Sequence, residues 1–274
     1  MSQSVVLGRT GITVGRLGLG ASYGPGAAAY EEAFERGANY FYWGSRRRSD
    51  MAEAIRTISK RARERLVVVV QSYARTGFLV KLNVERALRA LGLDHADLLL
   101  LGWYNDLPWR NIMDGARALR ERGRVKHLAL SGHRRTLFPE LLDESDIEAC
   151  HVRYNAVHRG AEREVFPAFA ARQASERPGL VTFTTTRWGH LCDPRKTPRG
   201  ERTPTGTDCY RFALSQPTVD VVMAGPGNPE QMRQALAALD RGPLPDDELA
   251  WMRRVGDAIY RGDGTSGIRD GAVL

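Results

Sequence analysis

The sequence predicts an α/β fold, a (β/α)₈ TIM barrel with an N-terminal β-hairpin. Three observations lead to this prediction. Strand-like and helix-like segments alternate along all 274 residues, most strand segments are continuous apolar runs, and no linker or low-complexity tract interrupts them. Continuous apolar runs are typical of strands buried on both faces, and an unbroken alternation of this length is typical of one barrel. We therefore expect a single domain over residues 1–274.

The individual elements follow from turn residues and from the spacing of apolar residues. The hairpin is predicted around Arg9-Thr10-Gly11, within residues 4–14. The eight barrel strands are expected at 16–20, 39–43, 66–70, 97–101, 127–131, 148–152, 180–184 and 219–223. Helices are expected between them, because apolar residues such as Met51, Ile55 and Ile58 recur on one helical face.

Three segments near the C-terminus are predicted separately. The last helix is expected from about 246 to 260. Residues 193–207 are rich in proline, threonine, arginine and glycine, and we predict a long loop there. The glycine-rich stretch 262–274 is predicted to be a flexible tail.

Charge and cysteine usage restrict the partners. The formal net charge is +8, but only four of the 40 basic residues are lysines, and the arginines are spread along the chain. Biased base composition explains this pattern, and attraction to anionic ligands is the alternative. No helix-turn-helix, zinc or RNA-binding motif accompanies the arginines, so we expect no nucleic-acid partner. No apolar run approaches the ~18 residues of a membrane span, and three unpaired cysteines without a visible signal segment favour the cytoplasm.

Aromatic residues gather just after the predicted strands, where chemistry is located in this fold. Such rings form a partly apolar pocket for a small molecule. For Trp43 and Trp188, packing beneath the loops is an equal alternative. The expected substrate pocket comprises Trp43, Gln71, Trp103, Tyr104, His133, Arg187 and Trp188, with Tyr73 near the same mouth.

Three residues are the candidates for catalysis. Strand alternation points Tyr42 inward together with Tyr40. His151 ends a strand, and histidine is the usual acid or base at neutral pH. Arg47 would bind a carboxylate or phosphate if it turns into the mouth, whereas a solvated arginine run over 46–48 is the alternative. No metal site is expected, because the six histidines show no HxH or HExxH spacing.

Several stretches resemble the aldo-keto reductases in order and spacing over roughly residues 4–240. LGRTGITVGRLGLG resembles that family's hairpin and first strand, and DLLLLGW its fourth strand. GRVKHLALSGH resembles the fifth strand, VRYN the region after the sixth, and GPGNPEQMRQALAAL the eighth strand-to-helix unit. The resemblance implies a parallel barrel, NADP(H), and hydride transfer to a carbonyl with a tyrosine proton donor supported by lysine, histidine and aspartate.

This sequence departs from the family at all four catalytic positions. The family's aspartate falls on Tyr42 and its tyrosine on Arg47. Its lysine falls on Gln71 and its histidine on Gly102. A phenol with a pKa near ~10 needs a neighbouring cation to exchange protons at neutral pH. The resemblance therefore implies a divergent, tetrad-lacking member with a rebuilt site.

The cofactor positions are only partly retained. A glycine turn before a helix that starts near Pro229 offers N–H groups to a phosphate, but the family's phosphate-binding arginine falls on Gln231. The resemblance thus implies NADP or NAD, with a weaker preference for the phosphorylated form. The residues to which it assigns cofactor binding are Ser131, Phe183, Gly225, Gly227, Asn228, Gln231 and Gln234.

Three functions remain open at this point. The first is an unusual NAD(P)-linked oxidoreductase that acts on a small carbonyl compound, an anionic one if Arg47 contributes. The second is a non-redox lyase or isomerase that uses Tyr42 and His151 as an acid–base pair. The third is a protein that binds a ligand without chemistry. The fold alone cannot choose among them.

Overall fold

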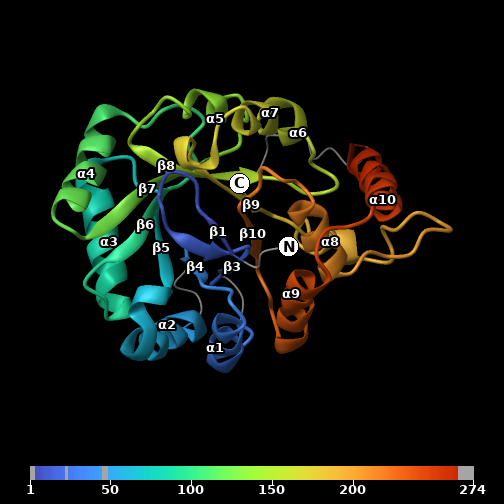
Figure 1. Ribbon diagram of the computed structural model, residues 1–274, viewed down its shortest axis with the longest axis horizontal. Coiled ribbons are helices and arrows are strands. Elements are labelled where there is room, and N and C mark those ends of the chain that lie inside the picture. Colours follow the sequence, from blue (N-terminus) through green and yellow to red (C-terminus); the bar gives the residue numbers. More distant parts are fainter. Residues whose placement is uncertain (1–3, 22–23, 45–48, 265–274) are drawn as a thin grey trace.

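Eight parallel strands form a closed barrel, as the sequence predicts (Figure 1). The computed structural model describes residues 4–21, 24–44 and 49–264. In sequence order the strands neighbour one another, and β10 closes the barrel onto β3. The strands are β3 (Leu17–Gly20), β4 (Tyr40–Trp43), β5 (Val67–Ser72), β6 (Ala96–Leu101), β7 (Val125–Gly132), β8 (Ile147–Arg153), β9 (Gly179–Phe183) and β10 (Val221–Ala224).

Helices surround these strands on the outside (Figure 1). Helices of nine to fifteen residues connect the strands from β3 to β7 and follow β9 and β10. The connections from β7 to β9 contain only helices of four or five residues. The helices are α1 (Ala27–Glu35), α2 (Asp50–Ala62), α3 (Gly77–Leu91), α4 (Arg110–Glu121), α5 (Leu137–Glu140), α6 (Ala161–Glu164), α7 (Phe166–Ala170), α8 (Gly206–Leu214), α9 (Pro229–Arg241) and α10 (Asp246–Gly264). Short 3₁₀ turns are η1 (Arg63–Arg65), η2 (Ala174–Glu176) and η3 (His190–Cys192).

The two faces of the strands pack into two separate cores. Inward-facing residues such as Tyr40, Val69 and Leu100 form a core inside the barrel. Outward-facing residues such as Phe41 pack against the helices in a larger second core. Because successive side chains of a strand point to opposite faces, seven of the strands contribute to both cores. The exception is β3, which alternates leucine with glycine and contributes only its two leucines, to the outer core. Packing on both faces explains the continuous apolar runs in the sequence.

The N-terminal hairpin covers the end of the barrel at which the strands begin. β1 (Ser4–Val6) pairs antiparallel with β2 (Thr13–Gly15). Leu7 and Val14 are fully buried in the inner core, and Val5 and Ile12 pack against it. The predicted hairpin over 4–14 is therefore confirmed, and it leaves only the opposite end of the barrel open.

A buried ion pair joins the segment before β9 to the segment before β10. Both nitrogens at the tip of Arg177 donate to Asp220 at 2.9 Å, and the backbone N–H of Leu180 donates to the same carboxylate at 2.7 Å. The two charged side chains are 6% and 7% exposed. Removal of either partner would leave the other charge buried and uncompensated, so the loss of one of these residues is expected to destabilise this part of the barrel strongly.

Two predicted boundaries near the C-terminus differ from the structure. The helix α10 extends to Gly264 rather than ending near residue 260, so the tail predicted from residue 262 begins with helical backbone. Residues 265–274 lie outside the described part of the chain. The predicted loop 193–207 ends earlier, because Thr205 caps α8, which begins at Gly206. In the described ranges no helix combines the length and the apolar character that crossing a bilayer requires.

Candidate active site

A cavity of about 220 Å³ opens at the ends of the barrel strands, opposite the hairpin. It is where the fold predicts chemistry. Its wall has an aromatic and hydroxyl character, and none of the described residues that line it carries an aspartate, glutamate, lysine or arginine side chain. Predicted site residues in this wall are Tyr42, Gln71, Trp103, Ser131, His151, Phe183, Trp188 and Gly225. Tyr73, which the sequence places near the mouth, also lies in this wall. Residues that the prediction did not assign to the site are Gly20, Leu100, Thr184, Thr185, Thr186, Tyr210, Met223 and Ala224.

Tyr42 points into the cavity from the end of β4. Its hydroxyl donates a hydrogen bond to the Gln71 side-chain oxygen, on the neighbouring strand β5. Burial raises the pKa of Tyr42 well above its usual value, and the nearby Tyr73 hydroxyl raises it further. Tyr42 is therefore a neutral phenol at any physiological pH.

His151 faces the same cavity from β8. Its ring lies 6.0 Å from that of Tyr42, measured between centroids, and its Nε2 is 2.8 Å from the Tyr40 hydroxyl. Burial lowers the pKa of His151 to about 3. The imidazole is therefore neutral at pH 7 and has no proton of an imidazolium ion to give.

Gly102 lies at the position to which the family resemblance assigns a histidine. A Cβ atom at Gly102 would lie 2.4 Å from the Gln71 side-chain nitrogen and 2.5 Å from the Tyr73 ring. Both side chains therefore occupy the space that any larger residue at position 102 would need. Tyr73 follows the end of β5, and this placement after a barrel strand is the reason why the sequence predicts it near the mouth, where it lines the cavity.

The backbone of the mouth loops is strained. Among the described non-glycine residues, positive φ angles occur only at Trp103, Thr184, Arg187 and Trp188, between 51° and 60°. All four lie in the loops after β6 and β9. Side chains rarely adopt this conformation, and strain of this kind concentrates at functional sites. It supports the assignment of the cavity as the functional site.

Some predicted pocket residues lie elsewhere. Trp43 is 6% exposed and packs in the outer core, because strand alternation that points Tyr42 inward points Trp43 outward. Tyr104 is buried behind the mouth, where its hydroxyl donates to the Ala74 carbonyl at 3.0 Å. Arg187 is 4% exposed and does not line the cavity. For these three residues the structure corrects the predicted position in the pocket.

Two further predicted residues are not part of the cavity wall. His133 lies behind Trp103 and Phe183, with ring centroids 5.9 Å and 6.1 Å away, and burial followed by the nearby Arg153 charge lowers its pKa. It supports the aromatic wall from the rear. Arg47 lies outside the described residues.

A groove of about 460 Å³ continues from the cavity toward α9. The cavity and the groove share Thr186, Trp188, Tyr210 and Gly225 as lining residues. Beyond these, the groove is lined by Gly189, Cys192, Gly206, Gly227, Gln231 and Gln234. With the shared Gly225, four of the residues assigned to cofactor binding lie in it. Asn228 does not line the groove but caps α9, where its side chain accepts from the Gln231 N–H at 2.9 Å.

The glycine turn before α9 is partly occupied by the protein itself. The Gly227 N–H donates to the Gln231 side-chain oxygen at 2.7 Å. A phosphate at a helix N-terminus is bound by N–H groups of this kind. An anion at this turn would therefore have to displace the Gln231 amide oxygen.

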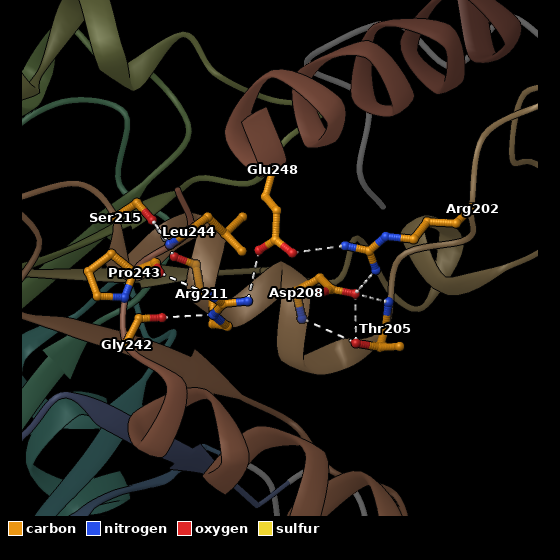
Figure 2. A network of polar contacts seen from close by, with 9 residues as sticks. All are labelled: Arg202, Thr205, Asp208, Arg211, Ser215, Gly242, Pro243, Leu244 and Glu248. Atoms are coloured by element: carbon orange, nitrogen blue, oxygen red, sulfur yellow. Dashed lines mark hydrogen bonds and ion pairs between the residues drawn. The ribbon is translucent and has the colours of Figure 1, made fainter. Parts of the chain in front are cut away.

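A polar network holds the far wall of the groove in place (Figure 2). Thr205 and Asp208 form a reciprocal cap at the start of α8, and Arg202 links Asp208 to Glu248 of α10 with N–O distances of 3.1 Å and 3.4 Å. Arg202 also lies 3.6 Å from the centre of the Trp251 ring. This network fixes the first turn of α8, which supplies Gly206 to the groove. A threonine followed three residues later by an acid is a capping signal that the sequence contains.

Within the described ranges, no three His, Cys, Asp or Glu side chains come together as metal ligands would. The site chemistry therefore consists of phenols, an imidazole, amides and hydroxyls.

The fold is shared with known enzymes. Neither a family model nor a curated protein matches the sequence. Among solved structures, the holo form of an aldo-keto reductase from Bacillus halodurans superposes with a TM-score of 0.75 at 21% identity, over 93% of this chain and 96% of that one. An aldo/keto reductase from Klebsiella pneumoniae in complex with NADP and acetate gives 0.74 at 18% identity, over 94% and 96%. The chain therefore has the fold of the aldo-keto reductases.

Proposed function

We propose that this protein is an unusual NAD(P)-linked oxidoreductase that acts on a small carbonyl compound at a rebuilt site. The observation that carries the proposal is the continuity between the mouth cavity and the groove that leads to α9. A dinucleotide is an extended ligand and needs two connected halves of a site. Phe183 lies at one end of this path and the Gly227 turn at the other, where the family resemblance assigns the nicotinamide ring and the adenosine phosphate.

The residues present fit NAD better than NADP. Phe183 offers a ring face and Ser131 a hydroxyl in the cavity wall, and Gln231 and Gln234 offer amides in the groove wall. No described residue that lines the groove carries a charged side chain. A neutral amide gives no charge-assisted contact to a 2′-phosphate. A nicotinamide bound against Phe183 would supply or accept a hydride at the cavity.

Tyr42 is the proton donor that we propose for this chemistry. Hydride addition to a carbonyl carbon leaves an alkoxide, which is basic enough to take a proton from a neutral phenol. Gln71 holds the Tyr42 hydroxyl toward β5, so the substrate oxygen has to compete with the Gln71 oxygen for that proton. His151 is neutral and completes the wall beside Tyr42, where it orients the substrate rather than protonating it.

The cavity favours a small carbonyl compound with an aromatic or conjugated body. Its described wall presents the rings of Tyr73, Trp103, Phe183 and Trp188 and no charged side chain. Aromatic rings gain from stacking on one another beyond the area they bury. An anionic substrate requires a cation from outside the described wall, and Arg47 is the residue we propose for that role.

Titration with NADH and NADPH tests the proposed function directly. We expect binding of NADH, followed by isothermal calorimetry or by the fluorescence of the reduced nicotinamide. If neither nucleotide binds, the oxidoreductase proposal fails. The protein would then bind a ligand without redox chemistry, which the occupied Gly227 N–H favours as the second candidate.

Replacing Gln231 by arginine is expected to strengthen NADPH binding. The change frees the Gly227 N–H and adds a cation at the groove, a charge-assisted contact worth about 1.5–3 kcal/mol, or ~10–150-fold in affinity. Calorimetric Kd values for both nucleotides measure it.

The matched control is Gln231→Leu, which frees the same N–H without adding charge. We expect Gln231→Leu to leave the ratio of NADPH to NADH affinity unchanged. A wild-type protein that already selects NADPH strongly over NADH would show that the phosphate is bound elsewhere.

Replacing Arg47 by alanine is expected to raise the KM for a carbonyl substrate that carries a carboxylate. A lost charge-assisted hydrogen bond of ~1.5–3 kcal/mol corresponds to ~10–150-fold. The KM for an uncharged analogue of the same shape should stay the same. Arg46→Ala and Arg48→Ala are the controls, and equal effects of all three changes would mean that the arginines act only through their summed charge.

A further inference from the structure

We propose that Cys192 and Cys209 form a peroxide-reactive dithiol that closes reversibly into a disulfide. Their sulfur atoms are 3.9 Å apart, although the residues are separated by 17 positions in the chain. Cys192 ends the 3₁₀ turn η3, and Cys209 lies in the first half of α8. The third cysteine, Cys150, is fully buried in β8. Only this one pair among the three cysteines has sulfur atoms in contact.

The two thiols differ in access. Cys192 is half-buried and lines the groove, so a small oxidant can reach it from solvent. Cys209 is 1% exposed and lies behind it. Cys192 is therefore the thiol that reacts first, and Cys209 the thiol that resolves the product.

The hydrogen bond between the thiols prepares the outer one for reaction. Either sulfur can donate this hydrogen bond. The arrangement with Cys209 as the donor lowers the pKa of Cys192 and raises that of Cys209. The thiolate is the reactive form of cysteine. Burial raises the pKa of Cys150 above its ordinary range, so that thiol is expected to be inert.

The reaction needs only a peroxide as oxidant. The Cys192 thiolate attacks one peroxide oxygen, the O–O bond breaks, and a sulfenic acid and hydroxide form. The Cys209 sulfur then attacks the Cys192 sulfur, an S–S bond forms, and the S–O bond breaks. The hydroxyl group of the sulfenic acid leaves with the Cys209 proton, as water. Two thiols are oxidised to a disulfide, and one peroxide is reduced to two waters.

The surrounding structure permits this closure. The sulfur atoms must approach by about 2 Å to reach the ~2.05 Å of a disulfide bond. Cys192 can supply the movement, because the segment 193–205 that follows it contains no helix or strand. Cys209 is held, because its neighbour Asp208 is tied to Thr205 and Arg202 (Figure 2). The proposal does not rest on nicotinamide binding, because the reaction uses only the two thiols and a peroxide.

The test treats the folded wild-type protein with a few equivalents of hydrogen peroxide. Free thiols are then alkylated and the protein is digested with trypsin without reduction. We expect a linked pair of peptides, 188–195 with 203–211, which dithiothreitol separates again. Cys150 should be recovered alkylated, and its own reaction with peroxide should be at least about tenfold slower. Absence of the linked peptides in the wild type overturns the proposal.

Single variants separate the two roles. Cys192→Ser should lose both the link and the fast reaction with peroxide. Cys209→Ser should lose only the link and leave a Cys192 sulfenic acid that a 1,3-diketone reagent traps. Cys150→Ser, the control, should form the link as the wild type does. Circular dichroism checks the fold of each variant. If Cys209→Ser does not fold, the rates at which Cys150 and Cys192 react with peroxide in the wild type test the assignment instead. Equal rates at Cys150 and Cys192 in the wild type would contradict the assignment of Cys192 as the thiol that reacts first.

Discussion

Replacing Tyr42 by phenylalanine is expected to lower kcat by about 10²–10⁴-fold, the range for the loss of one acid–base group. The change removes the hydroxyl that faces the cavity and keeps the ring that fills it. The KM should change little, because the lost interaction acts in the transition state. Steady-state kinetics with a carbonyl substrate and NADH measure both constants.

Tyr73→Phe is the matched control, because it removes the neighbouring phenol from the same cavity wall. Tyr73 is 52% exposed, whereas Tyr42 lies deeper in the barrel mouth. We expect Tyr73→Phe to retain kcat within about tenfold. A large loss in Tyr73→Phe together with a small loss in Tyr42→Phe would transfer the role of proton donor to Tyr73.

Replacing Asp220 by alanine is expected to lower the free energy of unfolding by about 3–5 kcal/mol, because the change leaves Arg177 buried without its counter-charge. It also removes the acceptor of the Leu180 N–H at the start of β9. Urea denaturation followed by circular dichroism measures the loss.

Asp240→Ala is the control for this effect. Asp240 pairs with Arg36 at 2.7 Å, but the side chains are 55% and 37% exposed. An exposed pair contributes only about 0–1 kcal/mol. If both variants lose the same stability, burial does not determine the contribution of the Arg177–Asp220 pair.

Most of the fold can be predicted from local patterns. The apolar runs identified all eight strands, and turn residues identified the hairpin. Boundaries were less certain, because glycine weakens a helix without forbidding it. This is why α10 continues through Gly262, at which we predicted that a tail begins.

The candidate site was predictable only in part. Strand alternation placed Tyr42 inside the barrel, and the same rule, had it been applied to the next residue, would have excluded Trp43 from the pocket. Tyr104 is buried, and its hydroxyl donates a hydrogen bond to the carbonyl of Ala74, a residue of another loop. The sequence contains no sign of this contact. Side chains in loops depend on neighbours that are remote in the chain.

The sequence by itself determined the barrel, its N-terminal hairpin, and the strands that deliver residues to the mouth. These features follow from periodicity and turn residues, which each segment carries alone. Only the tertiary structure decided which polar groups meet. Tyr40 contacts His151 across 111 positions, and Cys192 contacts Cys209 across 17. The continuity between the cavity and the groove also depends on how residues from separate segments, such as Trp188 and Gly225, pack together. Contacts of this kind depend on strand register around the closed barrel and on loop packing, because both bring together residues that no local pattern relates.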